Sequence, residues 1–170
     1  MLINTSPLDL FSAKVKSSKI NSGKFYLAAK SLKHNSIWVV GIGLKKKVKT
    51  TKCWVYFPDP AIPFYRMTYF SHYSHYVVPE GDINQYSSLL CEVAFSGRKS
   101  ISAAAVIKSS IDGLVKSGII SRQETKLIVS AFSKKIDYAY PIPTLDRDEN
   151  LKTIQSFLEK NNIYSRGRFG

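Results

Sequence analysis

Ser36-Ile-Trp-Val-Val-Gly-Ile-Gly-Leu44 is the stretch that decides the fold class, because it combines β-branched residues with almost no polar side chains. A continuous apolar run of this length is typical of a strand that is covered on both faces. After a cluster of lysines, Lys52–Phe57 alternates, with Trp54 and Tyr56 on one face. These two runs predict an antiparallel hairpin whose turn holds the lysines.

Working outward from this run, the sequence predicts further strands at Phe64–Phe70 and Ser88–Ser96 and an extended segment at Lys134–Ile142. Helices are predicted from apolar residues at helical spacing and from capping patterns, at Leu8–Val15, at Lys24–Leu32, from Ser102 to a stop at Gly118, after the Ser121 and Glu124 capping box through Leu127 and Ile128, and after Asp146 and Glu149. The order indicates an α+β fold, a mostly antiparallel sheet flanked by helices, in a single domain over residues 1–170.

The composition supports one globular domain. The chain has 170 residues and 44% hydrophobic content, enough for a core. It contains no apolar run of about 18 residues and no signal-peptide pattern, so we expect a cytoplasmic protein with no membrane partner. Cys53 and Cys91 are far apart and have no His or Cys at metal-ligand spacing, which predicts small buried side chains and no metal site.

The formal net charge of +13 predicts attraction to anions of any kind. Several lysines gather in the expected hairpin turn, a position where lysines are usually solvated: Lys45, Lys46, Lys47, Lys49 and Lys52. The sequence shows neither a recognition helix nor a stacking platform with interleaved Arg and Lys, so nucleic acid is not the expected partner. A non-catalytic basic module that binds polyanions stays open as an alternative.

No catalytic residue is predicted from the motifs. Gly41-x-Gly43 lies inside a strand-like run and lacks the third glycine and the following helix of a dinucleotide fingerprint. His34, His72 and His75 are not accompanied by a Ser or Cys nucleophile motif.

Arg66 is the residue most indicative of a site, because its guanidinium interrupts the aromatic and apolar strand Pro63-Phe-Tyr-Arg-Met-Thr-Tyr-Phe70. A charge in such a strand needs a partner. One interpretation is a structural salt bridge with Glu92 on a neighbouring strand; the other is a phosphate or carboxylate ligand, which suits the planar fork of arginine. Tyrosines accumulate around it and could stack on or hydrogen-bond to a sugar nucleotide.

A series of segments covers the chain in an order and spacing that resemble the later part of UDP-galactopyranose mutases, closest to the eukaryotic-type branch and to bacterial relatives labelled protoporphyrinogen-oxidase-like or amine-oxidase-like flavoproteins. The segments are Asn4-Thr-Ser-Pro-Leu-Asp9, Trp54-Val-Tyr-Phe-Pro58, Pro63-Phe-Tyr-Arg66, Phe70-Ser-His-Tyr-Ser74, Glu92-Val-Ala-Phe-Ser96, Tyr138-Ala-Tyr-Pro-Ile-Pro143 and Tyr164-Ser-Arg-Gly-Arg-Phe-Gly170.

The resemblance implies the substrate-binding part of an FAD-dependent isomerase that interconverts UDP-galactopyranose and UDP-galactofuranose for cell-surface polysaccharide biosynthesis. In that family, N5 of the reduced flavin attacks the anomeric carbon and displaces UDP, and ring opening then allows closure to the furanose. The residues that match those binding the diphosphate are Arg66, Tyr56, Tyr73 and Tyr140, and those that match positions beside the flavin are Gly167 and Arg168. The protein positions the phosphates while the cofactor supplies the difficult chemistry.

The chain also departs from the family pattern. It shows no strand, Gly-rich turn and helix for the FAD pyrophosphate, and it ends where the rest of the flavin site would follow. We therefore expect that it neither holds FAD tightly nor turns over substrate by itself, and that its partners are a UDP-sugar and a complementing FAD-binding segment or further copies of the chain. His72 and His75 replace the family's usual Asn and Pro. The alternative within enzymes is a part of another FAD-dependent amine-oxidase-like or protoporphyrinogen-oxidase-like oxidoreductase.

Overall fold

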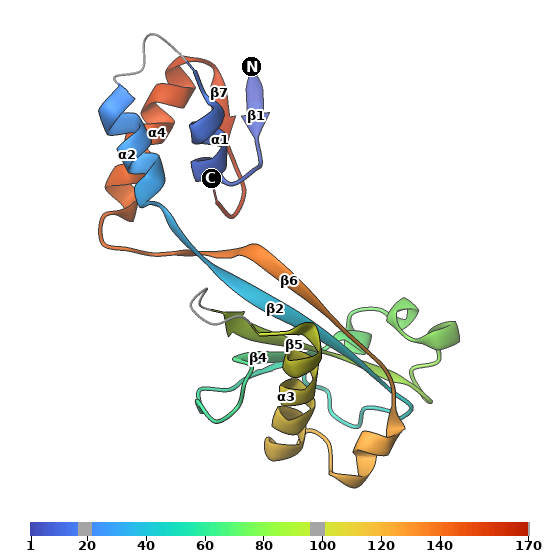
Figure 1. The fold of residues 1–170 in the computed structure, drawn as a ribbon. Helices are drawn as coiled ribbons and strands as arrows, with labels where there is room; N and C mark the ends of the chain where they lie inside the picture. The colour runs from blue at the N-terminus through green and yellow to red at the C-terminus, as the bar shows by residue number, and fades with distance from the viewer. Residues whose placement is uncertain (17–21, 96–100, 170) are drawn as a thin grey trace. The chain divides into compact units, whose positions relative to one another are not determined.

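The computed structural model describes residues 1–16, 22–95 and 101–169, and the chain forms two compact units (Figure 1). The first unit combines Met1–Asn35 with Tyr138–Gly170, and the second is the continuous segment Ser36–Asp137. Ser96 and Gly170, which end two of the segments quoted above, lie outside the described residues.

The second unit is built on an antiparallel sheet whose strands lie in the order β3-β4-β5-β2-β6. The strands are β2 (Lys33–Leu44), β3 (Trp54–Tyr56), β4 (Arg66–Tyr69), β5 (Ser87–Phe95) and β6 (Ile128–Ile142). The unit boundary falls within β2 and β6. The long helix α3 (Ala103–Lys116) packs on the sheet. Short 3₁₀ helices lie between β4 and β5 and between α3 and β6: η1 (Phe70–His72), η2 (His75–Val77), η3 (Pro79–Gly81) and η4 (Gln123–Leu127).

The core of the second unit lies between α3 and one face of the sheet. Alternate residues of the strands supply it, among them Val40, Met67 and Cys91, and α3 adds Val106 and Leu114. Because side chains alternate between the faces of a strand, the residues in between lie on the opposite face. Burial raises the pKa of the Cys91 thiol, so Cys91 acts as an apolar core residue.

Gly113 allows α3 to approach the segment before β4 closely. A Cβ at this position would lie 2.6 Å from Pro63 Cδ and 2.9 Å from Phe64 Cε1. The ring of Phe64 is fully buried and cannot move aside. The helix and the segment therefore pack at a distance that only glycine permits.

The first unit packs three helices around a small core of their own: α1 (Leu8–Lys14), α2 (Ser22–Ser31) and α4 (Arg147–Lys160). A short parallel pair joins β1 (Leu2–Asn4) to β7 (Ile163–Ser165). The core residues are Leu8, Phe25, Ala28, Ala29, Ile154 and Leu158.

The predicted α+β class with a mostly antiparallel sheet is confirmed, but the predicted hairpin is wrong. β4 and β5 lie between β2 and β3, so the lysine cluster is a connection across the sheet. β2 pairs instead with β5, from Ser36 opposite Phe95 to Leu44 opposite Ser87. Alternation shows which residues share a face; it does not show which strand lies next to which.

Several local predictions are also corrected. Cys53 is exposed, not buried, because it precedes the short edge strand β3. Ile128 begins β6 instead of continuing a helix. Asp146 makes no capping hydrogen bond to the backbone of α4; its carboxylate accepts a hydrogen bond from the Asn150 side chain at 3.0 Å.

Gly41 and Gly43 have a structural role in β2. An ideal Cβ at Gly41 would lie 2.0 Å from Cε1 of Phe132, and one at Gly43 would lie 2.4 Å from Oγ of Ser130. Both contacts come from the neighbouring strand β6, so these glycines make room for cross-strand side chains.

Candidate ligand-binding site

The candidate site lies on the sheet face opposite the α3 core. Two rows of residues cross the strands there, because the register aligns them. Tyr56 pairs with Arg66, which pairs with Glu92, and in the next row Trp54 pairs with Thr68, which pairs with Leu90. The short strands β3 and β4 thus place two exposed aromatic rings beside a guanidinium.

The Arg66 guanidinium is held by a buried carboxylate. Its Nε donates to Glu92 Oε1 at 2.7 Å, and its Nη2 forms an ion pair with the same oxygen. The second oxygen, Oε2, accepts a hydrogen bond from the Tyr65 hydroxyl at 2.5 Å. Glu92 is only 4% exposed, so both partners are needed to satisfy its charge. The structural salt bridge considered from the sequence therefore exists.

The ion pair leaves Arg66 at the edge of a hollow. Arg66 Nη1 donates to the Tyr56 hydroxyl at 3.4 Å, and its Cζ lies 5.9 Å from the centre of the Tyr56 ring. The hollow has a volume of about 320 Å³ and is lined by Trp54, Arg66, Thr68, Phe70, Tyr73, Leu90 and Glu92. Phe70 and Tyr73 come from η1 and the residue after it, and their ring centres are 6.0 Å apart.

Three of the residues predicted for the site are thus brought together in the second unit. Arg66 and Tyr73 line the hollow, and Tyr56 contacts Arg66 beside it. Trp54, Tyr56 and Tyr73 each expose about half of their surface, and an exposed aromatic patch of this kind is typical of an interaction site. Such an arrangement offers stacking faces, hydroxyl groups and a guanidinium to a flat or anionic ligand.

The other predicted residues, Tyr140, Gly167 and Arg168, lie in the first unit. The Arg168 Cζ is 4.6 Å from the centre of the Tyr140 ring, a cation–π contact. Gly167 has φ of +104°, and nothing lies within 4 Å of the position of a Cβ there. Glycine therefore stands at this position for its backbone conformation and leaves open space beside it.

Next to this pair lies an aromatic cluster that the sequence did not reveal. The His34 ring stacks on Tyr138 with centres 3.8 Å apart, and the Tyr138 hydroxyl donates to Asp9 Oδ2 at 2.9 Å. Phe169 also contacts the Tyr138 ring, edge to face, with ring centres 5.8 Å apart. These residues come from distant segments, so no spacing in the sequence could have grouped them.

The described residues were also compared with the geometry of a metal site and of a membrane-spanning helix. Within residues 1–16, 22–95 and 101–169, no group of three or more His, Cys, Asp or Glu side chains could hold a metal ion. Among the described helices, none is both long and apolar enough to span a membrane.

The fold resembles parts of proteins whose structures are known. No protein-family model matches the chain. A crystal structure of reduced UDP-galactopyranose mutase matches over 99% of this chain, with 35% sequence identity and a TM-score of 0.86. A provisionally named protoporphyrinogen oxidase from Exiguobacterium sp. 255-15 matches over 97% of the chain with a TM-score of 0.67, but at 10% identity this likeness shows the fold alone.

The fold is therefore that of one part of a UDP-galactopyranose mutase or amine-oxidase-like flavoprotein. More particularly, the chain matches a portion of a UDP-galactopyranose mutase-like flavoenzyme, which confirms the resemblance seen in the sequence. The chain spans about a third of the length of these matched proteins, 35% in each case.

Proposed function

We propose that this chain is the sugar-nucleotide-binding portion of a UDP-galactopyranose mutase-like flavoenzyme, and that the Arg66 hollow receives the diphosphate of UDP-galactose. The whole enzyme would interconvert UDP-galactopyranose and UDP-galactofuranose. The observation that carries the proposal is the row Tyr56–Arg66–Glu92, which fixes a guanidinium beside tyrosine hydroxyls at the edge of a hollow.

Glu92 and Tyr65 give Arg66 its orientation. With Nε and Nη2 directed to Glu92, the Nη1 side is turned toward Tyr56 and the hollow. A guanidinium fixed in this way loses little side-chain entropy when it meets a phosphate oxygen. Glu92 also offsets the charge of Arg66, so the Tyr56 and Tyr73 hydroxyls would supply additional hydrogen bonds to the diphosphate.

Gly167 and Arg168 would contribute to flavin binding in the whole enzyme, and Tyr140 keeps its proposed role as a ligand of the substrate diphosphate. A cation stacked on an aromatic ring, next to open space at a glycine, fits a flat and negatively charged group such as FAD. When bound, reduced FAD supplies the nucleophile of the reaction. The side chains of this chain would bind and orient the substrate and keep water away from it.

The fold alone does not choose this substrate, because the same fold occurs in a protein named as an oxidoreductase. We choose a diphosphate because the Arg66 guanidinium and the tyrosine hydroxyls beside the hollow are hydrogen-bond donors that suit phosphate oxygens. A basic module for polyanions would instead spread its affinity over many lysines and lose it steeply as salt is added.

Calorimetric titration of the folded chain with UDP tests the proposal. We expect Arg66→Ala to weaken UDP binding by about 1.5 to 3 kcal/mol, because a charge-assisted contact to the diphosphate is lost. Arg122→Ala is the matched control, since Arg122 is exposed, forms an ion pair with the exposed Asp112 at 3.7 Å and does not line the hollow.

Because Arg66→Ala strands a buried carboxylate, a second variant separates folding from binding. The double change Arg66→Met with Glu92→Gln removes both charges and should fold while losing UDP affinity. Wild-type affinity in either variant, or a folded wild type without UDP binding, would overturn the proposal and favour an oxidoreductase with another substrate.

A further inference from the structure

A second hollow opens on the other face of the same sheet. It has a volume of about 290 Å³ and is lined by Leu44, Lys46, Lys47, Val48, Lys49, Thr50, Tyr69, Ser87, Leu89, Ile119 and Ile120. Tyr69 and Leu89 line this hollow, whereas their neighbours Thr68 and Leu90 line the Arg66 hollow. Since adjacent residues of a strand point to opposite faces, the two hollows are separate.

The floor of this second hollow is apolar and carries hydroxyl groups. Leu44, Leu89 and Ile120 are buried core residues that reach its wall. Ser87 is 2% exposed, and its Oγ is buried without a hydrogen-bond partner among the described residues. Burial raises the pKa of Tyr69, so its phenol stays a neutral hydroxyl. A buried hydroxyl without a partner is unfavourable unless a ligand or water completes it.

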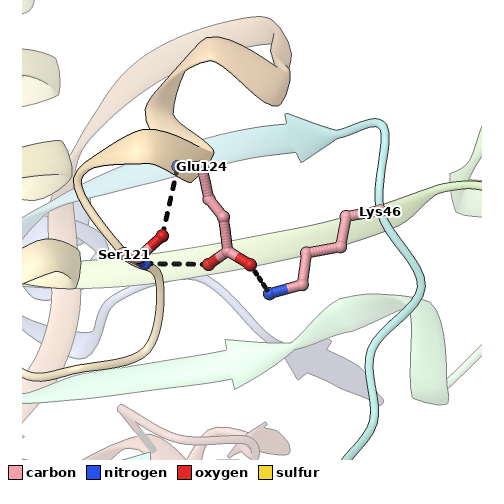
Figure 2. A network of polar contacts seen from close by, with 3 residues as sticks. All are labelled: Lys46, Ser121 and Glu124. Atoms are coloured by element: carbon pink, nitrogen blue, oxygen red, sulfur yellow. Dashed lines mark hydrogen bonds and ion pairs between the residues drawn. The ribbon is translucent and has the colours of Figure 1, made fainter.

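The rim of the hollow carries lysines, and one of them is held by an ion pair. Figure 2 shows Lys46 in contact with Glu124, whose carboxylate also accepts from the Ser121 backbone N–H at 2.8 Å. The Lys46 and Ser121 contacts hold the pKa of Glu124 below its usual range, so the Glu124 carboxylate that pairs with Lys46 is charged at neutral pH. The Lys45 N–H donates to the Leu127 carbonyl at 2.8 Å, which holds the lysine-rich connection between β2 and β3 from the same side.

On the other side of this connection, Lys47 Nζ donates to Asn84 Oδ1 at 2.7 Å. Within the described part of the chain, Lys49 has no carboxylate partner. Three lysines thus line the hollow, and among the described residues the only carboxylate in an ion pair with one of them is Glu124, which leaves the rim with a net positive charge.

We propose that this hollow is a binding site for a small amphipathic anion, with an apolar ring or short acyl body on the Leu44–Leu89–Ile120 floor and one phosphate or carboxylate at the lysine rim. The volume is near the lower limit for small-molecule pockets, about 300 Å³, so the ligand is small. The site is independent of the Arg66 hollow and of the function proposed for it.

Methyl NMR of the full chain with ¹³C-labelled isoleucine tests the proposal, because Ile119 and Ile120 report on the hollow directly. The probe is 1-naphthyl phosphate, with 1-naphthoate as the carboxylate arm and the neutral 1-naphthalenemethanol as the control body. Both anions should shift the Ile119 and Ile120 methyl signals saturably, and the neutral control should bind about two- to fivefold more weakly.

Variants locate the probe. Lys49→Gln should weaken the binding of 1-naphthyl phosphate about two- to fivefold, whereas Lys45→Gln, in the same connection but outside the lining, should not. Ile119→Trp should fill the hollow and abolish the shift of Ile120, and Arg66→Lys should leave the affinity unchanged. The proposal is overturned if no saturable shift occurs at these methyl groups, if the neutral control binds equally well, or if Ile119→Trp has no effect.

Discussion

At the scale of single residues, the pair of Arg66 and Glu92 joins stability to recognition. Both oxygen atoms of the buried Glu92 carboxylate are used, one by Arg66 and one by Tyr65. Such a group is strongly destabilising when it loses a partner, although the intact pair contributes little net stability. The same contacts that satisfy the charge also orient the guanidinium.

We expect Glu92→Gln to lower the free energy of unfolding by about 1 to 3 kcal/mol, because the amide cannot accept both the Arg66 and the Tyr65 hydrogen bonds as a carboxylate does. Urea denaturation of the full chain at neutral pH measures this loss. Asp148→Asn is the control, since Asp148 is fully exposed and its contact with Arg147 is long, at 3.8 Å. Equal effects of the two changes would contradict the role given to Glu92.

Much of the residue-level prediction rested on chemistry that a sequence shows directly. Arg66 was expected to need a partner, and Glu92 provides it. Tyr56 and Tyr73 were expected beside Arg66, and the register of β3 with β4 places Tyr56 there. The cluster of His34, Tyr138 and Asp9 could not be foreseen, because its members meet only after distant segments have folded together.

At the scale of elements, α3 depends on one glycine. A helix normally gains stability when glycine is replaced by alanine, by about 1 kcal/mol. At Gly113 the new methyl group would overlap with Pro63 and with the buried Phe64.

We therefore expect Gly113→Ala to destabilise the chain by about 1 to 2 kcal/mol, the cost of overpacking exceeding the gain in helix propensity. Thermal denaturation followed by circular dichroism checks the sign. Gly23→Ala, in α2 with no atom within 4 Å of its Cβ position, should instead be neutral or stabilising. If the two substitutions shift the midpoint alike, the close approach of α3 does not limit stability.

The elements themselves were largely predictable, and their neighbours were not. The apolar spacing of α3 and the stop at Gly118, where φ is +72°, were expected. The strand partners were missed because the register of β2 with β5 is decided by long-range fit between two apolar strands. A cluster of lysines is compatible with a tight turn and equally with the longer connection that it forms.

At the scale of the whole molecule, the two units divide the predicted site residues between them. Arg66, Tyr56 and Tyr73 lie in the segment 36–137, and Tyr140, Gly167 and Arg168 lie in the other unit. The fold class followed from the sequence because it needs only the kinds and order of the elements. The division into two units could not be predicted from the sequence, because it depends on which strands pass from one unit into the other.

We expect residues 36–137 to fold by themselves. Their core of buried residues, from Val40 to Ile120, lies entirely within this continuous segment. A fragment of these residues should show a cooperative thermal transition and disperse its methyl NMR signals. Without such a transition, the segment would depend on the first unit for its stability, and the two units would not be independent.

The hydrogen bond from Ser36 Oγ to the Asp137 carbonyl oxygen, 2.8 Å long, shows that the two ends of this segment meet. A segment whose ends are adjacent can be inserted into a host without stretching it, and its chain order can be permuted by joining the old ends and opening a loop elsewhere. Residues 36–137 are thus a continuous insertion between the two segments of the first unit. We expect that this insertion can be moved into another protein, or redesigned, as one piece that includes the Arg66 hollow.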